Sequence, residues 1–311
     1  MSYKHEMKMN PPIRDIDVSV IIVNFNTLEL TRQCIQSIVN HTQGISYEII
    51  VIDNNSNDGS QAILSSDPRI YFIKSRENLG FGKANNLGIH NAAGKYLLFL
   101  NSDTYLKNNA IYEFWKFNEE NKKMKIGACG CILYGEDMSR RHSYAKLMTT
   151  KRVLSFYAIS PFSKSYARKL MGMDVEDENK DFIDVGYVTG ADIFVQKKVI
   201  HDCGAFDPDF FMYSEECEMQ WRFRKKGYRN IIIKTPKIVH LEGMSQKNKE
   251  YPSMNKIIMI QSSLFLYVKK TSSYLKYISL RLFFPFTRIH FLLFAKRPIS
   301  EKMKYLQFLL S

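Results

Sequence analysis

The sequence has few cysteines, and none of them are paired at metal-site spacing. Its 311 residues contain five cysteines, an odd number at scattered positions, and no CxxC motif. This argues against a disulfide framework and against a thiolate zinc site. Cys129 and Cys131 lie two residues apart in a strand-like run, so both should face one side as small buried groups. We expect all five cysteines to be reduced.

Long uncharged apolar runs are also absent. No apolar stretch reaches the ~20 uncharged residues that a membrane span requires. The opening residues MSYKHEMKMNPPIRD are polar and do not resemble a signal peptide. There is no long, polar, repetitive tract, and 45% of the residues are hydrophobic. These features predict a folded cytoplasmic protein with one sizeable core and an appendage.

Acidic residues are scarce at the end of the chain. From Tyr251 to Ser311 there are ten Lys or Arg and one acid, Glu301, so this segment carries +9 of the formal net charge of +13. Basic residues interrupt its apolar stretches, which is typical of amphipathic helices on a surface. We predict a basic helical tail over 251–311 that binds an anionic membrane surface, peripherally on the inner face of the cell membrane. Its apolar context suits lipid better than stacked bases, so no nucleic acid partner is expected.

Strand-like and helix-like segments alternate in the first hundred residues. Hydrophobic strands separated by helices indicate an α/β fold with a mostly parallel, Rossmann-like sheet and helices on both faces. A less regular region at 138–184 is expected to form a flexible loop facing the acceptor. The predicted strands are 18–23, 48–52, 69–73, 96–100 and 193–195, and the predicted helices are 27–40, 58–64, 80–91, 197–203 and 216–226.

Polar residues follow three of these strands directly. They are Asn24 after the first, the run 53–55 after the second and the run 101–103 after the fourth. Ligands bind at the carboxyl ends of strands in open parallel sheets, so three polar clusters there predict one pocket. The alternative is that Asn54 and Asn55 merely terminate a strand as turn residues.

Four segments, taken in order, resemble the family 2 glycosyltransferases. The similarity extends from about Val18 to Gly243 and is greatest to a bacterial rhamnosyltransferase-like group that acts on cell-surface polysaccharides. The segments are VSVIIVNFNTLELTRQCIQSI, EIIVIDNNSNDGS, NLGFGKANNLGI with YLLFLNSDT, and FDPDFFMYSEECEMQWRFRKKGY.

This resemblance implies a GT-A fold and an inverting sugar transfer. The expected donor is a nucleoside-diphosphate sugar of the UDP or dTDP type carrying rhamnose or another hexose, and the acceptor is a glycan or a lipid-linked oligosaccharide. The implied organisation is an extension at 1–17, a catalytic domain at 18–250 and the tail at 251–311. Within the catalytic domain, 18–105 would bind the nucleotide and 106–250 the acceptor.

The resemblance also assigns the catalytic and metal-binding roles. Glu216 matches the catalytic base of a Glu-Asp pair, which here is Glu215-Glu216. Asp103 matches the metal motif DxD, whose first residue here is Asn101, and His240 matches a later histidine ligand. The implied cofactor is Mg²⁺ or Mn²⁺, which suit oxygen ligands. The residues expected around the nucleotide sugar are Asn24, Asn26, Asp53, Asn78, Gly80, Asn85, Ser102 and Asp192.

Other interpretations of these residues stay open. An acid such as Glu216 at a helix start also occurs simply because it favours the helix dipole. Gly80-Phe81-Gly82 before a helix, with Asp103 about twenty residues later, partly fits a dinucleotide oxidoreductase. The substitutions at Asn101 and Glu216 also fit a membrane-binding pseudo-transferase without activity. Neither the sugar, the acceptor nor the oligomeric state can be read from the residues.

Overall fold

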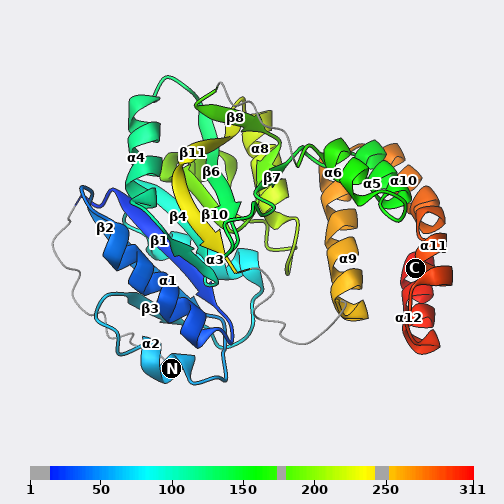
Figure 1. Ribbon diagram of the computed structural model, residues 1–311, viewed down its shortest axis with the longest axis horizontal. Coiled ribbons are helices and arrows are strands. Elements are labelled where there is room, and N and C mark those ends of the chain that lie inside the picture. Colours follow the sequence, from blue (N-terminus) through cyan, green and yellow to red (C-terminus); the bar gives the residue numbers. More distant parts are fainter. Residues whose placement is uncertain (1–14, 174–179, 242–251) are drawn as a thin grey trace, which may run out of the picture.

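A mixed nine-stranded sheet forms the centre of the larger of two units in this computed structural model, which describes residues 15–173, 180–241 and 252–311 (Figure 1). The strand order is β3-β2-β1-β4-β10-β6-β11-β5, with β8 paired to β11, and β7 pairs separately with β9. The strands are β1 (Val18–Asn24), β2 (Tyr47–Asp53), β3 (Tyr71–Lys74), β4 (Tyr96–Asn101), β5 (Thr104–Leu106), β6 (Ile126–Tyr134), β7 (Tyr144–Ala145), β8 (Phe182–Val185), β9 (Tyr187–Val188), β10 (Asp192–Gln196) and β11 (Arg229–His240).

The first four strands are parallel. The buried apolar runs of β1, β2 and β4 predict this arrangement, whereas β3 is a partly exposed edge strand. The pairing register places Asn24 opposite Asp53 and Val23 opposite Asn101, so β1, β2 and β4 end at one edge. β10 runs antiparallel to β4 and β6, and β6 is parallel to β11. The register therefore gathers the three polar clusters at one edge of the sheet.

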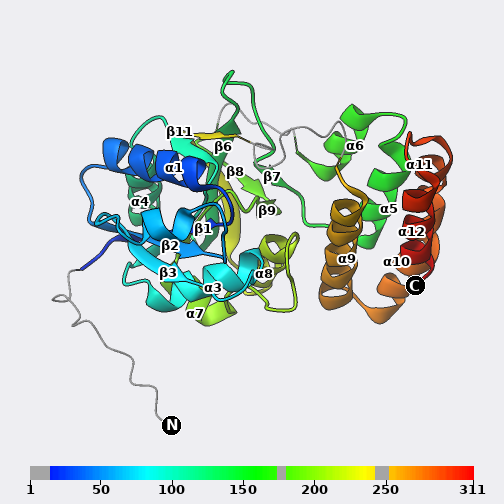
Figure 2. The same ribbon diagram turned by 90° about the horizontal axis from the view of Figure 1, so that it is seen from below.

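Helices cover both faces of this sheet (Figure 2). One face packs on α1 (Leu28–His41) and α4 (Ala110–Glu120), and the cysteines Cys34, Cys129 and Cys131 lie in that core. All five cysteines are free, as predicted. The other face packs on α3 (Phe81–Asn91), α7 (Lys197–Cys203) and α8 (Glu215–Lys225), while α2 (Ser60–Leu64) is a short connecting helix.

A second unit consists of helices that stand beside the sheet (Figure 1). Its buried core includes Val153, Phe265 and Phe284 and is continuous with Tyr187 of β9 and Cys217 of α8 in the larger unit. Only Asp15–Asp17 of the predicted extension 1–17 are described, and the expected boundary at 250/251 lies outside the described residues. The helices are α5 (Thr150–Ile159), α6 (Lys164–Met171), α9 (Met254–Thr271), α10 (Tyr274–Thr287), α11 (Ile289–Phe294) and α12 (Ile299–Leu310).

The expectation of an irregular, flexible loop at 138–184 was wrong for its central part, because α5 and α6 lie there. Each helix begins with a side-chain cap, in which Thr149 accepts from the Arg152 N–H and Ser163 from the Tyr166 N–H. Both helices pack in the second unit, α5 directly against α10. The apolar partner therefore comes from more than one hundred residues later in the chain.

By length and composition, one helical stretch among the described residues is long and apolar enough to cross a membrane. It runs from Tyr274 to Phe294, through α10 and α11, and 17% of its most apolar window is buried. Arg288 lies between the two helices. Most of this stretch is therefore not covered by the protein itself.

An ion-pair network far from the strand ends offers a test of the fold. Burial raises the pKa of Glu119, but hydrogen bonds from Lys122, Lys95 and Tyr96 outweigh it and lower the pKa to about 2. We expect Glu119→Gln to lose about 1–2 kcal/mol of unfolding free energy at pH 7. A carboxylate with a depressed pKa stabilises the fold above its unfolded value near 4.5, so the difference should vanish as the pH falls through about 2. Urea unfolding at pH 7 and at about pH 2 measures this difference in unfolding free energy. The exposed neighbour Glu120 provides the control, and an equal loss in Glu120→Gln would contradict a stabilising role for the Glu119 ion pairs.

Candidate active site

A cavity of about 500 Å³ lies where the strand ends, α8 and the second unit meet. The start of α8 contributes Glu215 and Glu216, and the ends of β4 and β11 contribute Asn101 and His240. Ile260 of α9 closes it from the second unit. The cavity therefore joins residues from three distant parts of the sequence.

The backbone before α8 is strained where it enters this cavity. Tyr213 and Ser214 have φ angles of 75° and 67°, in the left-handed region that non-glycine residues seldom adopt. The Phe211 carbonyl accepts a hydrogen bond of 3.0 Å from the Phe81 N–H, which ties this loop to the start of α3. Such strain persists where surrounding structure imposes it and is common at functional sites.

Gly80 is required at this junction for steric reasons. Its φ is 79°, and a Cβ at this position would collide with the Phe211 carbonyl oxygen. Gly80 was expected to let a nucleotide approach the backbone. In the structure the backbone of Phe211 packs against Gly80, and the approach of a nucleotide to this glycine stays a prediction.

Glu215 and Glu216 differ in their surroundings although they are adjacent. Glu215 is 2% exposed, and burial, with the nearby Glu216 charge, raises its pKa well above the ordinary value. Its Oε2 has no hydrogen-bond partner among the described residues. Burial also raises the pKa of Glu216, but backbone hydrogen bonds at the start of α8 oppose this. These bonds favour the charged form of Glu216 over that of Glu215.

Asp103 and His240 meet at the side of the cavity. The Oδ1 of Asp103 lies 3.3 Å from Nε2 of His240, and their side chains are 17% and 11% exposed. Pairing of His240 with Thr104 and a 2.9 Å bond from the Leu241 N–H to the Asp103 carbonyl fix their separation. No group of three or more His, Cys, Asp or Glu side chains suited to a metal occurs in the described parts of the chain. Asp103 and His240 are thus a pair of potential ligands, and their binding of a cation stays a prediction.

A chain of hydrogen bonds connects Ser102, which precedes Asp103, to Asn24 and Asp53, which were predicted to bind the nucleotide sugar. Asn24 donates 2.7 Å to Asp53 and accepts 3.0 Å from Thr27, whose hydroxyl lies 3.0 Å from that of Ser102. Asn24 and Asp53 are fully buried. They brace the strand ends, whereas Asn26, with a φ of 54°, is exposed on the surface of this edge.

The remaining predicted binding residues are divided between the edge and the interior. The Asn78 Oδ1 accepts from the Asn54 side chain at 2.9 Å and from the Gly80 N–H at 3.0 Å, which fixes the turn before α3. Asn85 is buried and donates 3.0 Å to the Phe81 carbonyl within α3. These bonds give both asparagines a positioning role.

Asp192 does not occupy the predicted place on the sugar-binding surface. It is fully buried on β10, and its Oδ2 accepts 2.7 Å from the Cys131 N–H. Burial raises its pKa to about 7. Gly190 and Ala191, which precede β10, line the cavity. Asp192 is the first residue of β10 and lies inside the sheet.

The sequence analysis did not predict several of the residues that line the cavity. His142 and Met148 come from the segment expected to be irregular, Tyr187 follows that segment on β9, and Ile260 comes from the predicted tail. None of them lies in a motif. Only the packing of the second unit against α8 reveals them.

Comparison with known proteins gives a consistent result. The model of glycosyl transferase family 2 matches residues 19–204. Glycosyltransferase GlyA of Streptococcus pneumoniae is 26% identical over 210 residues, which cover 60% of this chain and 29% of GlyA. Poly(ribitol-phosphate) beta-glucosyltransferase of Bacillus spizizenii is 34% identical over 111 residues, which cover 34% of this chain and 18% of the relative. The chain thus spans less than a third of the length of either relative.

Solved structures share the fold at low sequence identity. S. aureus TarS matches with a TM-score of 0.56 and 14% identity, over 94% of this chain and 48% of TarS. GalNAc-T7 with UDP, GalNAc and Mn²⁺ matches with a TM-score of 0.54 and 15% identity, over 79% of this chain and 48% of that chain. The fold is thus the predicted GT-A type, with additional C-terminal helices.

Proposed function

Because this chain belongs to glycosyl transferase family 2, we propose that it transfers a sugar from a nucleoside diphosphate to an acceptor hydroxyl with inversion. The observation that carries the proposal is that Glu216 and His240, on α8 and β11, line one cavity. This shared cavity supports Glu216 as the base and His240, with its neighbour Asp103, as the pair near the diphosphate. Residues 18–105 would hold the nucleotide and 106–250 the acceptor.

Glu216 is the proposed general base. The acceptor oxygen forms the new bond to the anomeric carbon while the bond to the diphosphate oxygen breaks, and the hydroxyl proton passes to the Glu216 carboxylate. A single displacement of this kind inverts the anomeric carbon. Because burial raises the pKa of Glu216, the ionised carboxylate is a stronger base than a solvated one.

Asp103 and His240 are the proposed holders of Mg²⁺ or Mn²⁺. Such an ion, when bound, neutralises the negative charge that develops on the leaving diphosphate. GalNAc-T7, which shares the fold, contains Mn²⁺ in its solved structure. Asn101 replaces the first carboxylate of the motif, so Asp103 alone supplies a formal negative charge.

The nucleotide side of the proposal rests on the edge formed by β1 and β2. Asp53 and Asn24 hold the strand ends, and Asn26 presents an exposed amide there. We propose a UDP or dTDP donor carrying rhamnose or another hexose. The names of the relatives support a glycan acceptor in cell-surface polysaccharide synthesis, either free or linked to lipid.

The second unit supports a peripheral position on the inner face of the cell membrane. Its exposed apolar side chains include Leu275, Leu282 and Phe286. Together with the +9 charge of 251–311 they favour an anionic lipid surface. A dinucleotide-binding role is less well supported, because Phe211 occupies the space beside Gly80 that a pyrophosphate would need.

Thermal unfolding with a panel of nucleotides tests the proposed function. A ligand at a hundred times its dissociation constant adds about 2.7 kcal/mol, which corresponds to about 5 °C in a chain of this size. We expect this shift with UDP or dTDP only when Mn²⁺ is present, and no shift with ADP. A shift with NAD(H) in place of the diphosphates would support the oxidoreductase alternative and reject the proposal.

A further inference from the structure

Arg288 is a cation that is buried in the second unit. It is 8% exposed and lies between α10 and α11. Its Nε donates 2.8 Å to the Tyr305 hydroxyl, which in turn donates 2.7 Å to Gln261. Among the described residues, no carboxylate pairs with its guanidinium. Buried charges are normally paired, so a guanidinium held in this way favours an anion from outside the chain.

Aromatic rings hold the guanidinium in place. Its carbon lies 5.1 Å from the ring centre of Tyr157 and 4.8 Å from that of Phe291. Contacts of this kind restrict the position of the guanidinium, and among the described residues its only hydrogen bond is the one from Nε. Arg288 is therefore preorganised as a donor.

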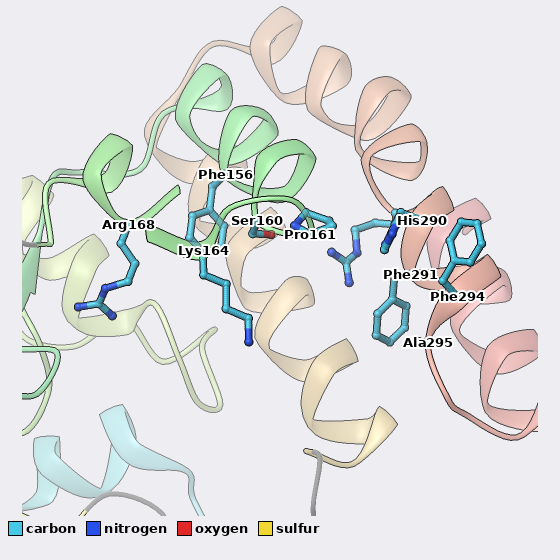
Figure 3. A pocket seen from close by; sticks show the side chains of 10 residues that line it. Phe156, Ser160, Pro161, Lys164, Arg168, His290, Phe291, Phe294 and Ala295 are labelled. Atoms are coloured by element: carbon cyan, nitrogen blue, oxygen red, sulfur yellow. The ribbon is translucent and has the colours of Figure 1, made fainter. Parts of the chain in front are cut away.

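The donor faces a cavity of about 630 Å³ in the second unit, distinct from the candidate active site. Figure 3 shows Lys164 and Arg168 of α6 on one side of it and Phe291 and Phe294 of α11 on the other. Cationic groups and an aromatic wall thus line the same space. This combination matches a ligand that is anionic at one end and apolar at the other.

The rim of this cavity continues into exposed aromatic surface. Phe162 is 79% exposed and Phe294 is 69% exposed, and both rings contact His290, at 5.5 Å and 4.9 Å between ring centres. Aromatic side chains at such exposure favour the interfacial region of a bilayer. A small soluble phosphate would satisfy the cations but leave these rings in water.

We infer that this cavity binds one phosphate-headed lipid, with the phosphate on Arg288 and Lys164 and an acyl chain along Phe291 and Phe294. The proposed site takes one lipid molecule per chain. A general electrostatic attraction to an anionic surface would have no such fixed stoichiometry. It does not depend on transferase activity, so a failure of one proposal leaves the other standing.

Binding of short-chain lipids below their micelle concentration tests the site in the full chain. Calorimetry with dihexanoyl phosphatidylglycerol should give saturable binding with one lipid per chain. Inorganic phosphate and dihexanoyl phosphatidylcholine should each bind about tenfold more weakly, since one lacks the chains and the other the net charge. Equal affinity for inorganic phosphate, or binding without saturation, would overturn the lipid assignment.

Two lysines of α6 provide a matched pair of variants. Lys164 lines the cavity, whereas Lys169, which is also exposed, does not. Lys164→Glu should weaken phosphatidylglycerol binding at least about fivefold, and Lys169→Glu less than about twofold. Equal weakening in both variants would mean that overall charge, not the cavity, governs binding.

Arg288→Gln tests the central donor. Far-UV circular dichroism and thermal unfolding should show a folded chain, and the affinity for phosphatidylglycerol should fall about tenfold or more. Unchanged affinity in a folded Arg288→Gln variant would overturn the proposal. If this buried substitution unfolds the second unit, the comparison of the two lysine variants decides.

Discussion

Replacing Glu216 with Gln should lower kcat about a thousandfold while the affinity for the nucleoside diphosphate changes less than about twofold. Gln has the same size and keeps hydrogen bonds at the start of α8, but it cannot take the acceptor proton. Glu216 lines the cavity from the start of α8, whereas the proposed nucleotide-binding residues Asn24 and Asp53 lie at the ends of β1 and β2. Initial rates and calorimetric titration with UDP or dTDP separate the two effects.

The adjacent Glu215→Gln variant is the matched control for Glu216. Burial favours the neutral form of Glu215, so an amide replaces a group that carries little charge in the folded chain. We expect its kcat to fall by no more than about tenfold. A thousandfold loss in Glu215→Gln together with a mild effect in Glu216→Gln would assign the base to Glu215. Full activity in both variants would show that neither Glu215 nor Glu216 is the general base.

The pH dependence of the rate gives an independent test of the same assignment. A general base acts when ionised, so kcat/KM should rise with pH through the pKa of the base. Burial raises the pKa of Glu216, and the two carboxyls influence each other, so the acidic limb should have an apparent pKa above 4.5 that belongs to the pair. This limb should be lost in Glu216→Gln. A profile that stays flat down to pH 4.5 in the unmodified chain would contradict a buried base.

The parallel half of the fold could be predicted because its signals are local. Each strand from β1 to β4 is a continuous apolar run followed at once by a polar residue, such as Asn24 or Asp53. The parallel register then brings these residues to one edge without further information. The same pattern correctly placed α1, α3 and α8, whose boundaries differ from prediction by at most one residue.

The second unit could not be predicted in the same way because its contacts are remote in sequence. α5 packs on α10, and Ile260 of α9 forms a wall of the cavity. Local periodicity reports only that a helix has an apolar side, not what covers that side. A local motif can also suggest a contact without showing whether the side chain is exposed. At Asp192 the motif suggested a ligand contact, but the sheet buries the carboxylate, which accepts a hydrogen bond from the Cys131 N–H.

Asp103→Asn should raise the Mn²⁺ concentration required for half-maximal activity about a hundredfold. Asn keeps an oxygen donor in place but removes the formal negative charge, and Asn101 offers no second charge to compensate. At saturating Mn²⁺, kcat should return to within about tenfold of the unmodified value, because the base on α8 is intact. Activity measured over a Mn²⁺ series, with calorimetry of Mn²⁺ binding in the presence of UDP, gives both numbers.

The converse variant, Asn101→Asp, separates a metal site from a purely structural pair. If Asp103 and His240 form only an ion pair that joins β4 to β11, a second carboxylate at 101 adds repulsion and should leave the Mn²⁺ requirement unchanged. If they hold the ion, the added charge should lower the Mn²⁺ requirement about tenfold while slightly destabilising the metal-free chain. Opposite changes in metal requirement for Asp103→Asn and Asn101→Asp would therefore locate the cation between these strand ends. An unchanged requirement in both variants would assign Asp103 and His240 to the fold alone, and the diphosphate charge would then have to be balanced elsewhere in the cavity.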